Sequence, residues 1–237
     1  MKIGLFTDCH YNHAEEIGGG RRPAASYEKI KEAMEHFRRE GVEVCFCLGD
    51  MTDHTPSDTK KDIEKCYREA MELITSFNIP FYLVPGNHDY LVLSADEMRR
   101  MCGFKIPPYT VICDECDIIV LDANYRSNMV RFDKAGVVWT DANLPPDQLE
   151  YLERALRCTY RDCIVMVHEN LDNTLDRSHV IKNADAARKI IKRSGKVKAV
   201  IQGHYHGGAH TVIDGIPYIT LPAMCESESD YYRVIDV

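Results

Sequence analysis

Short apolar runs typical of buried strands alternate with stretches of helical periodicity, and this alternation limits the folds open to the chain. The expected strands are 2–7, 43–48, 81–84, 109–113, 117–122, 163–167, 197–202, 209–213, 216–221 and 231–236. The expected helices are 26–40, 58–77, a short helix after the Ser94–Glu97 capping box, one from Pro145-Pro146 to about 157, and 184–194. Strand–helix alternation followed by hairpins predicts an α/β layered fold with parallel and antiparallel pairing.

Punctuating residues set the expected element ends. Ser26 is the predicted N-cap of the first helix, with Gly41 as its C-terminal stop, and Gly103 closes the short helix. Asp214-Gly215 predicts a tight hairpin between two of the later strands. At 237 residues, without an internal repeat, the chain is expected to form a single domain over residues 1–237.

Composition excludes several classes of protein. With 45% hydrophobic and 28% charged residues the chain can bury a core, which rules out disorder and fibrous repeats. The net charge of −8 argues against a nucleic-acid partner. No run approaches the ~20 apolar residues of a membrane helix, and Asp8 interrupts the first apolar stretch before a signal-peptide core could form. A chain with so large a core needs no disulfide framework, so its ten cysteines are compatible with the reducing cytoplasm. We therefore expect a cytoplasmic protein, and the lack of a long apolar run predicts that it has no membrane partner.

Polar side chains follow five of the expected strands, where α/β folds build their sites. They are Asp8, His10, Asp50, Asn87, His168, His204 and His206. Carboxylate, amide and imidazole donors favour Mn, Fe or Zn. Seven ligands are too many for one ion and suit two if a carboxylate bridges them. A pair of cations ~3.5–4 Å apart can stabilise the attacking and leaving oxygens of a phosphoryl transfer.

These residues form a recognisable set of motifs: Asp8-x-His10, Gly49-Asp50, Gly86-Asn87-His88-Asp89, His168 and Gly203-His204-x-His206. In this order the set resembles the five motifs of the calcineurin-like metallophosphoesterases. The resemblance implies an αββα sandwich of two mixed sheets flanked by helices, and two divalent or mixed-valence metal ions. Asp8, His10 and His206 would hold one metal, Asn87, His168 and His204 the other, and Asp50 would bridge them. His88 would contact the phosphate, beside Asn87, and help the leaving group, with Asp89 orienting His88.

A narrower likeness is to the manganese-dependent ADP-ribose/CDP-alcohol diphosphatases. It rests on Arg21-Arg22…Ser26, Leu121-Asp122-Ala123, Asp147-Gln148-Leu149 and the run from Gly203 to Ile216. His168-Glu169-Asn170 departs from the more usual His-x-Pro of the wider family. Arg21 and Arg22 are candidate substrate contacts, because guanidinium groups suit phosphate oxygens, although such a loop pair is often only solvated.

The motifs together predict a dimetal hydrolase of phosphoester or phosphoanhydride bonds that uses a metal-bridging hydroxide. Its expected partner is a small-molecule phosphoester, namely a small phosphodiester or a nucleotide-type pyrophosphate. Alternatives are a cyclic-nucleotide phosphodiesterase, a phosphomonoesterase, and a metal-bound protein-interaction scaffold without turnover. Residues 124–144, which include Trp139, are the candidate cap of the pocket, and His13 and His54 are expected on the surface or behind the ligands.

Overall fold

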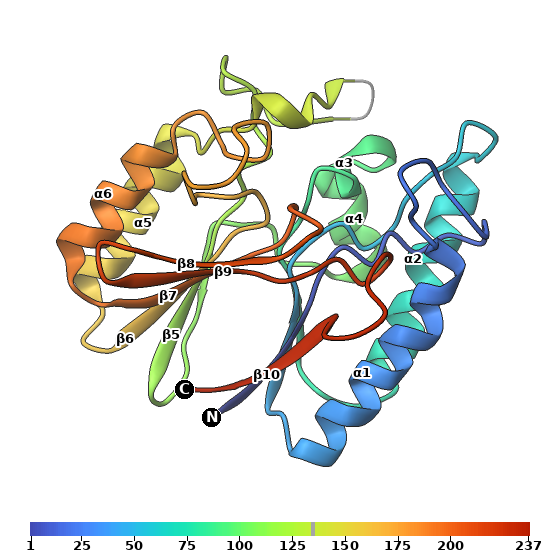
Figure 1. The fold of residues 1–237 in the computed structure, drawn as a ribbon, viewed down its shortest axis with the longest axis horizontal. Helices are drawn as coiled ribbons and strands as arrows, with labels where there is room; N and C mark the ends of the chain where they lie inside the picture. The colour runs from blue at the N-terminus through green and yellow to red at the C-terminus, as the bar shows by residue number, and fades with distance from the viewer. Residues whose placement is uncertain (134–135) are drawn as a thin grey trace.

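The chain folds around two mixed β-sheets, seen in a computed structural model that describes residues 1–133 and 136–237 (Figure 1). In the first sheet the order is β10-β1-β2-β3, and in the second it is β4-β5-β6-β7-β9-β8. The first sheet contains β1 (Lys2–Phe6), β2 (Val44–Cys47), β3 (Phe81–Leu83) and the antiparallel edge strand β10 (Tyr232–Asp236). The second contains β4 (Tyr109–Val111), β5 (Cys116–Val120), β6 (Asp162–Met166), β7 (Val197–Gln202), β8 (Ala209–Ile213) and β9 (Ile216–Thr220).

Helices cover the outer face of each sheet, which confirms the expected αββα order of layers (Figure 1). On the first sheet lie α1 (Ser26–Glu40), α2 (Lys60–Thr75) and α4 (Ala95–Cys102), and on the second lie α5 (Pro146–Cys158) and α6 (Ala184–Ser194). The short α3 (Asp89–Val92) and two 3₁₀ turns, Pro23–Ala25 and Trp139–Asp141, were not predicted.

Strand β2 shows how the sequence specifies two buried layers. Val44 and Phe46 join the apolar cluster between the sheets, while Cys45 and Cys47 join the cluster beneath the helices. Because successive strand residues point to opposite faces, a strand covered on both sides needs an unbroken apolar run. Val-Cys-Phe-Cys supplies that run, and all four residues are buried.

Every predicted strand and helix is present, with ends that differ from the prediction by at most two residues, and one predicted cap is corrected. The Ser94–Glu97 capping box forms, and Gly41 and Gly103 end their helices with φ of 71° and 69°. Ser26 is not the N-cap, because the 3₁₀ turn runs directly into α1 and makes Ala25 the flanking residue. The Ser26 hydroxyl instead donates to the carbonyl of Cys9 at 2.5 Å, which ties the start of α1 to the loop after β1.

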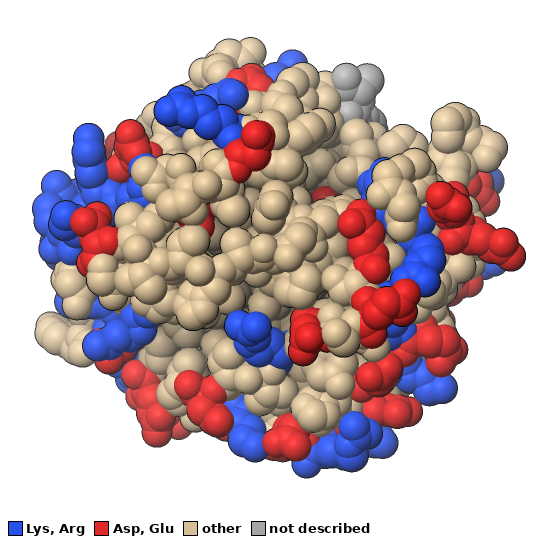
Figure 2. Space-filling view, in the orientation of Figure 1, with Lys and Arg blue, Asp and Glu red and all other residues tan. Residues whose placement is uncertain are grey.

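The two chain ends lie together at the edge of the sandwich opposite the site loops (Figure 1). The N-terminal amine donates to the carbonyl of Val237 at 2.7 Å. Acidic side chains predominate over the α1–α2 side of the face in Figure 2, and basic ones gather over the α5–α6 side. Among the described residues no helix combines the length and apolarity that crossing a bilayer requires.

Candidate functional site

Loops at the carboxyl ends of β1, β2, β3, β6 and β7 converge at one edge of the sandwich and bring all seven predicted ligands together. Nε2 of His168 lies 3.3 Å from Oδ2 of Asp50, and Nε2 of His206 lies 3.5 Å from Oδ1 of Asp8. The Nε2 atoms of His10 and His206 are 3.2 Å apart. Segments nearly 200 residues apart in sequence therefore share one cluster of donors.

The backbone at these loops takes up a conformation that ordinary side chains disfavour. Asp8, His10, Asp50 and His204 have φ of 49°, 46°, 52° and 68°. Such positive φ values cost free energy and persist where neighbouring structure enforces them. Here the amide of Asp8 donates to the carbonyl of Gly49 at 2.9 Å, and the amide of His10 to that of Asp50 at 2.9 Å.

Glycines of the motifs leave room for the polar groups. A Cβ on Gly86 would lie 2.7 Å from the backbone nitrogen of Asp50 and 2.8 Å from Nε2 of His168. Gly49 combines a φ of 114° with the same crowding, since its Cβ would lie 2.8 Å from Cγ of His168. The motifs need glycine at these positions because the ligands pack against bare backbone.

Burial and mutual contacts set the charge states of the cluster. Burial opposes ionisation of Asp8, but His168, His10 and His206 hold the pKa of its carboxyl well below the ordinary value. Burial also opposes protonation of His10, yet Asp53, Asp8 and Asp50 raise its pKa to about 9. Burial and nearby His168 lower the pKa of His204 to about 3. The site thus pairs ionised carboxylates with imidazoles, and a cation binding to His10 must displace its proton.

Several buried donor atoms fit a bound metal. Oδ1 of Asp8, Oδ1 of Asn87 and Nε2 of both His168 and His204 have no hydrogen-bond partner among the described residues. Buried polar atoms without partners are costly, and here they come from different loops that meet at one place. Ligand atoms of Asp50, His168 and His204 lie within 4.8 Å of one another, and so do those of His10, Asp50 and His88. The two groups share Asp50.

A hydrogen bond between the sheets orients one imidazole. Nδ1 of His168, which follows β6, lies 2.7 Å from the carbonyl oxygen of Leu48, which follows β2. A carbonyl can only accept, so Nδ1 carries a proton, and Nε2 is the nitrogen that faces the cluster and could bind a metal after losing any proton of its own. On the far side of the cluster Nδ1 of His206 lies 2.6 Å from Oε1 of Glu226, which the sequence analysis did not identify.

Asp53, rather than Asp89, orients His88. Oδ1 of Asp53 lies 2.9 Å from Nδ1 of His88. Asp89 instead accepts from the backbone amides of Asp50, Met51 and Gly86 at 3.0, 3.0 and 2.8 Å and from the Tyr67 hydroxyl. Its carboxylate holds two of the motif loops together. The role predicted for Asp89 is corrected accordingly, and Asp53 is a residue that the sequence analysis missed.

The two predicted substrate-contact arginines have different surroundings. Arg21 lines the cavity over the cluster, and its Nη1 lies 2.6 Å from Oδ2 of Asp53. Arg22 pairs with Glu228, is partly exposed, and is absent from the lining formed by the described residues. The pair of arginines in the sequence thus separates into one residue at the site and one at the surface.

The cavity over the cluster has a volume of about 360 Å³, within the ~300–1,000 Å³ of small-molecule sites. Trp139, in the segment 124–144 predicted as a cap, lines it and lies 5.7 Å from the His204 ring. Residues 134 and 135 of that segment lie outside the described residues. His179 and Tyr205 also line the cavity, although no sequence pattern pointed to His179. Cys225 has its sulfur within 4.8 Å of ring nitrogens of His10 and His206 and was also missed.

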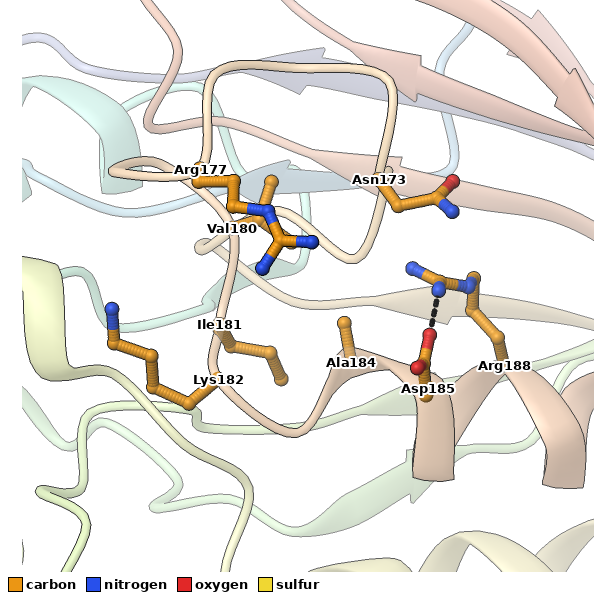
Figure 3. A pocket seen from close by; sticks show the side chains of 8 residues that line it. All are labelled: Asn173, Arg177, Val180, Ile181, Lys182, Ala184, Asp185 and Arg188. Atoms are coloured by element: carbon orange, nitrogen blue, oxygen red, sulfur yellow. Dashed lines mark hydrogen bonds and ion pairs between the residues drawn. The ribbon is translucent and has the colours of Figure 1, made fainter.

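A second cavity, of about 210 Å³, lies along residues 173–188 (Figure 3). Arg177, Lys182 and Arg188 contribute to its wall, and Arg188 pairs with Asp185. None of the predicted site residues belongs to its lining as the described residues define it. Of these two cavities, only the first is lined by residues of the motifs.

Comparison with known proteins gives one consistent result. The family model described as calcineurin-like phosphoesterase matches residues 1–208. A 3',5'-cyclic adenosine monophosphate phosphodiesterase CpdA of Haemophilus influenzae is 22% identical over 95% of this chain and 77% of its own. The CpdA of Escherichia coli K12 is 24% identical over 95% of this chain and 76% of its own.

Solved structures show the same fold at low identity. A dimetal phosphatase from Danio rerio superposes with a TM-score of 0.79 at 17% identity, covering 96% of this chain and 88% of its own. Phosphopantetheinyl hydrolase from Mycobacterium tuberculosis gives a TM-score of 0.59 at 12% identity, over 99% and 95% of the two chains. The predicted two-sheet sandwich is thus confirmed by structural neighbours.

Replacing Gly86 by alanine tests whether the cluster depends on bare backbone. The added methyl group meets the amide of Asp50 and the ring of His168, neither of which can move freely. We expect Gly86→Ala to lower the free energy of unfolding by about 1–3 kcal/mol, measured by urea denaturation of the chelated protein.

Gly18→Ala is the matched control, because no described atom lies within 4 Å of a Cβ there. It should change the free energy of unfolding by no more than ~0.5 kcal/mol. Equal losses in the two variants would contradict the steric explanation.

Proposed function

The chain belongs to the calcineurin-like phosphoesterase family, and we propose that it cleaves small phosphodiesters of the nucleotide class. Membership makes it a hydrolase of phosphoester bonds with a two-metal centre. The observation that carries the proposal is the set of unpartnered donor atoms at the base of an open cavity with aromatic walls.

The proposed metal ligands are those that the family motifs imply, and donor distances support them. Asp8, His10 and His206 would hold one ion, since Oδ1 of Asp8 lies 3.8 Å from Nε2 of His10 and 3.5 Å from Nε2 of His206. Asn87, His168 and His204 would hold the second, and Oδ2 of Asp50 lies 3.6 Å from His10 and 3.3 Å from His168. Two divalent ions bound there would supply electrostatic stabilisation of phosphate oxygens and lower the pKa of a bound water from ~15.7 toward ~7. Mn, Fe and Zn all suit these oxygen and nitrogen donors.

His88 is proposed as the group that contacts the phosphate and protonates the leaving oxygen. It lines the cavity, and its Nδ1 is 2.9 Å from the Asp53 carboxylate. A carboxylate on Nδ1 fixes the tautomer and stabilises the imidazolium, which leaves Nε2 as the nitrogen that exchanges a proton with substrate. The same Asp53 carboxylate holds Arg21 beside the cavity, so one buried anion positions both groups.

Three observations support a nucleotide-like phosphodiester. The relatives that align over most of the chain are described as cyclic AMP phosphodiesterases. Trp139 and Tyr205 offer flat apolar surface at the cavity, which a base can stack against. Arg21 adds a positive charge at the same wall. Phosphodiester cleavage accounts for these features together.

A substrate panel tests the proposed function. The chelated protein is reloaded with Mn, Fe(II) or Zn and assayed on bis-p-nitrophenyl phosphate and p-nitrophenyl phosphate, then on cyclic nucleotides and nucleotide diphosphates. We expect diester hydrolysis to exceed monoester hydrolysis and cyclic nucleotides to be cleaved. A preference for the monoester would favour a phosphomonoesterase, one for diphosphates a pyrophosphatase, and silence with every metal a scaffold without turnover.

Removing the His88 ring separates catalysis from metal binding. We expect His88→Ala to retain both metals but to lower turnover by about 10²–10⁴-fold, as loss of a general acid does. Steady-state rates and elemental analysis of the same preparation give the two readouts. Asp50→Ala is the contrast, since loss of the shared carboxylate should lower metal content. A fully active His88→Ala variant would contradict the proposed role of His88 as general acid.

The neighbouring arginines provide an internal comparison for substrate binding. Arg21→Ala should raise the KM for a cyclic nucleotide about tenfold, the effect of losing one hydrogen bond to a charged group. Arg22→Ala removes the same charge from the adjacent residue, outside the cavity lining, and should leave KM unchanged. Equal effects of the two substitutions would show that only long-range charge matters.

A further inference from the structure

A second group of metal-binding side chains lies away from the catalytic centre, between the loop after β1 and helix α2. His13 lies in that loop, and Cys66 and Glu69 lie three residues apart on α2, which places them on one face of the helix. One donor atom of each residue lies within 4.8 Å of the donors of the other two. Nε2 of His13 is 2.7 Å from Oε2 of Glu69.

We propose that His13, Cys66 and Glu69 form a separate binding site for zinc. One imidazole nitrogen, one sulfur and one carboxylate oxygen are the donor types that zinc takes in proteins, and three protein ligands leave a fourth position for water. The thiolate and the carboxylate balance the charge of a divalent ion. The thiol of Cys66 is the feature that separates this site from an ordinary surface pair of histidine and glutamate.

Burial and outer contacts suit such a site. Cys66 is only 1% exposed, whereas the side chains of His13 and Glu69 are 49% and 29% exposed. The soft ligand thus lies at the base and the other two open toward solvent, from which an ion can enter. The Tyr11 hydroxyl donates to Oε2 of Glu69 at 2.9 Å, and outer partners of this kind orient metal ligands.

The site would stabilise the loop that carries Arg21. That loop leaves β1 through His10 and continues past His13 to Arg21, which contacts Asp53. Cys66 and Glu69 flank Tyr67, whose hydroxyl bonds Asp89 between two motif loops. An ion held by His13 and α2 would therefore fasten the loop to the helix that already supports the catalytic centre. This role is structural and does not depend on which phosphoester is cleaved.

Cobalt substitution tests the proposal, because thiolate ligation gives Co²⁺ a near-ultraviolet charge-transfer band. The reduced, chelated full chain is titrated with Co²⁺ and followed by absorbance and elemental analysis. We expect one metal equivalent beyond the catalytic centre, accompanied by the band. Cys66→Ser and His13→Gln should both lose that equivalent, and His13→Gln alters only a half-exposed side chain. Tyr11→Phe should weaken the affinity about 10–100-fold.

Two further variants locate the thiolate. Asp50→Asn, which disrupts the catalytic centre, should keep the band. Cys225→Ser should keep it as well, although Cys225 lies beside His10 and His206. A band that disappears in Cys225→Ser and persists in Cys66→Ser would move the thiolate to the catalytic centre and overturn the proposal. A titration in which the protein binds only the Co²⁺ equivalents of the catalytic centre would also overturn the proposal.

Discussion

The structure depends on bringing carboxylates and imidazoles of different loops together in a largely buried region. Asp8 and Asp50 are buried carboxylates, and each is approached by imidazoles of other loops. An isolated buried carboxylate would take up a proton rather than remain charged, so the ionised state needs partners. Imidazoles supply part of that compensation, and a pair of bound cations would supply the rest. The positions of the imidazoles at the site therefore compensate the charge of carboxylates that the fold buries.

Both sheets are needed to hold that arrangement. His168 belongs to a loop of the second sheet, yet its tautomer is fixed by the carbonyl of Leu48 in the first. The backbone amide of His204 donates to Oδ2 of Asp8 at 3.1 Å, again from one sheet to the other. A change in the packing between the sheets would thus shift ligands relative to one another. The apolar cluster between the sheets has a functional consequence as well as a stabilising one.

Features that depend on periodicity and residue type could be predicted from the sequence. Contacts that depend on how a loop directs a side chain in space could not. Alternation of strands and helices is a local property, so an α/β layered fold could be predicted from it, as could the group of donors at the strand ends. The αββα order of the layers followed from the family resemblance. In the sequence Asp53 is an ordinary polar residue of a loop. Its contact with His88, which lies directly before α3, depends on how two separate loops are placed in space. Arg21 and Arg22 are identical in type and adjacent, and only the course of the loop assigns one to the cavity.

Donor chemistry separates the two metal environments that we propose. The catalytic ligands are oxygen and nitrogen atoms, which accept Mn or Fe readily, whereas the group on α2 includes a thiol that favours softer ions. In a mixture of metals the thiol would favour zinc at His13, Cys66 and Glu69, whereas the catalytic donors would take Mn, Fe or Zn according to availability. Cys225 lies close enough to His10 and His206 to weaken that distinction if its thiol bound the same ion. Hydrogen bonds hold the backbone of Cys225 in place, because its amide donates to the carbonyl of Asp8 at 3.1 Å and its carbonyl accepts from the amide of Arg22 at 3.0 Å. Binding of an ion by this sulfur therefore depends on the side-chain rotamer and not on movement of the loop.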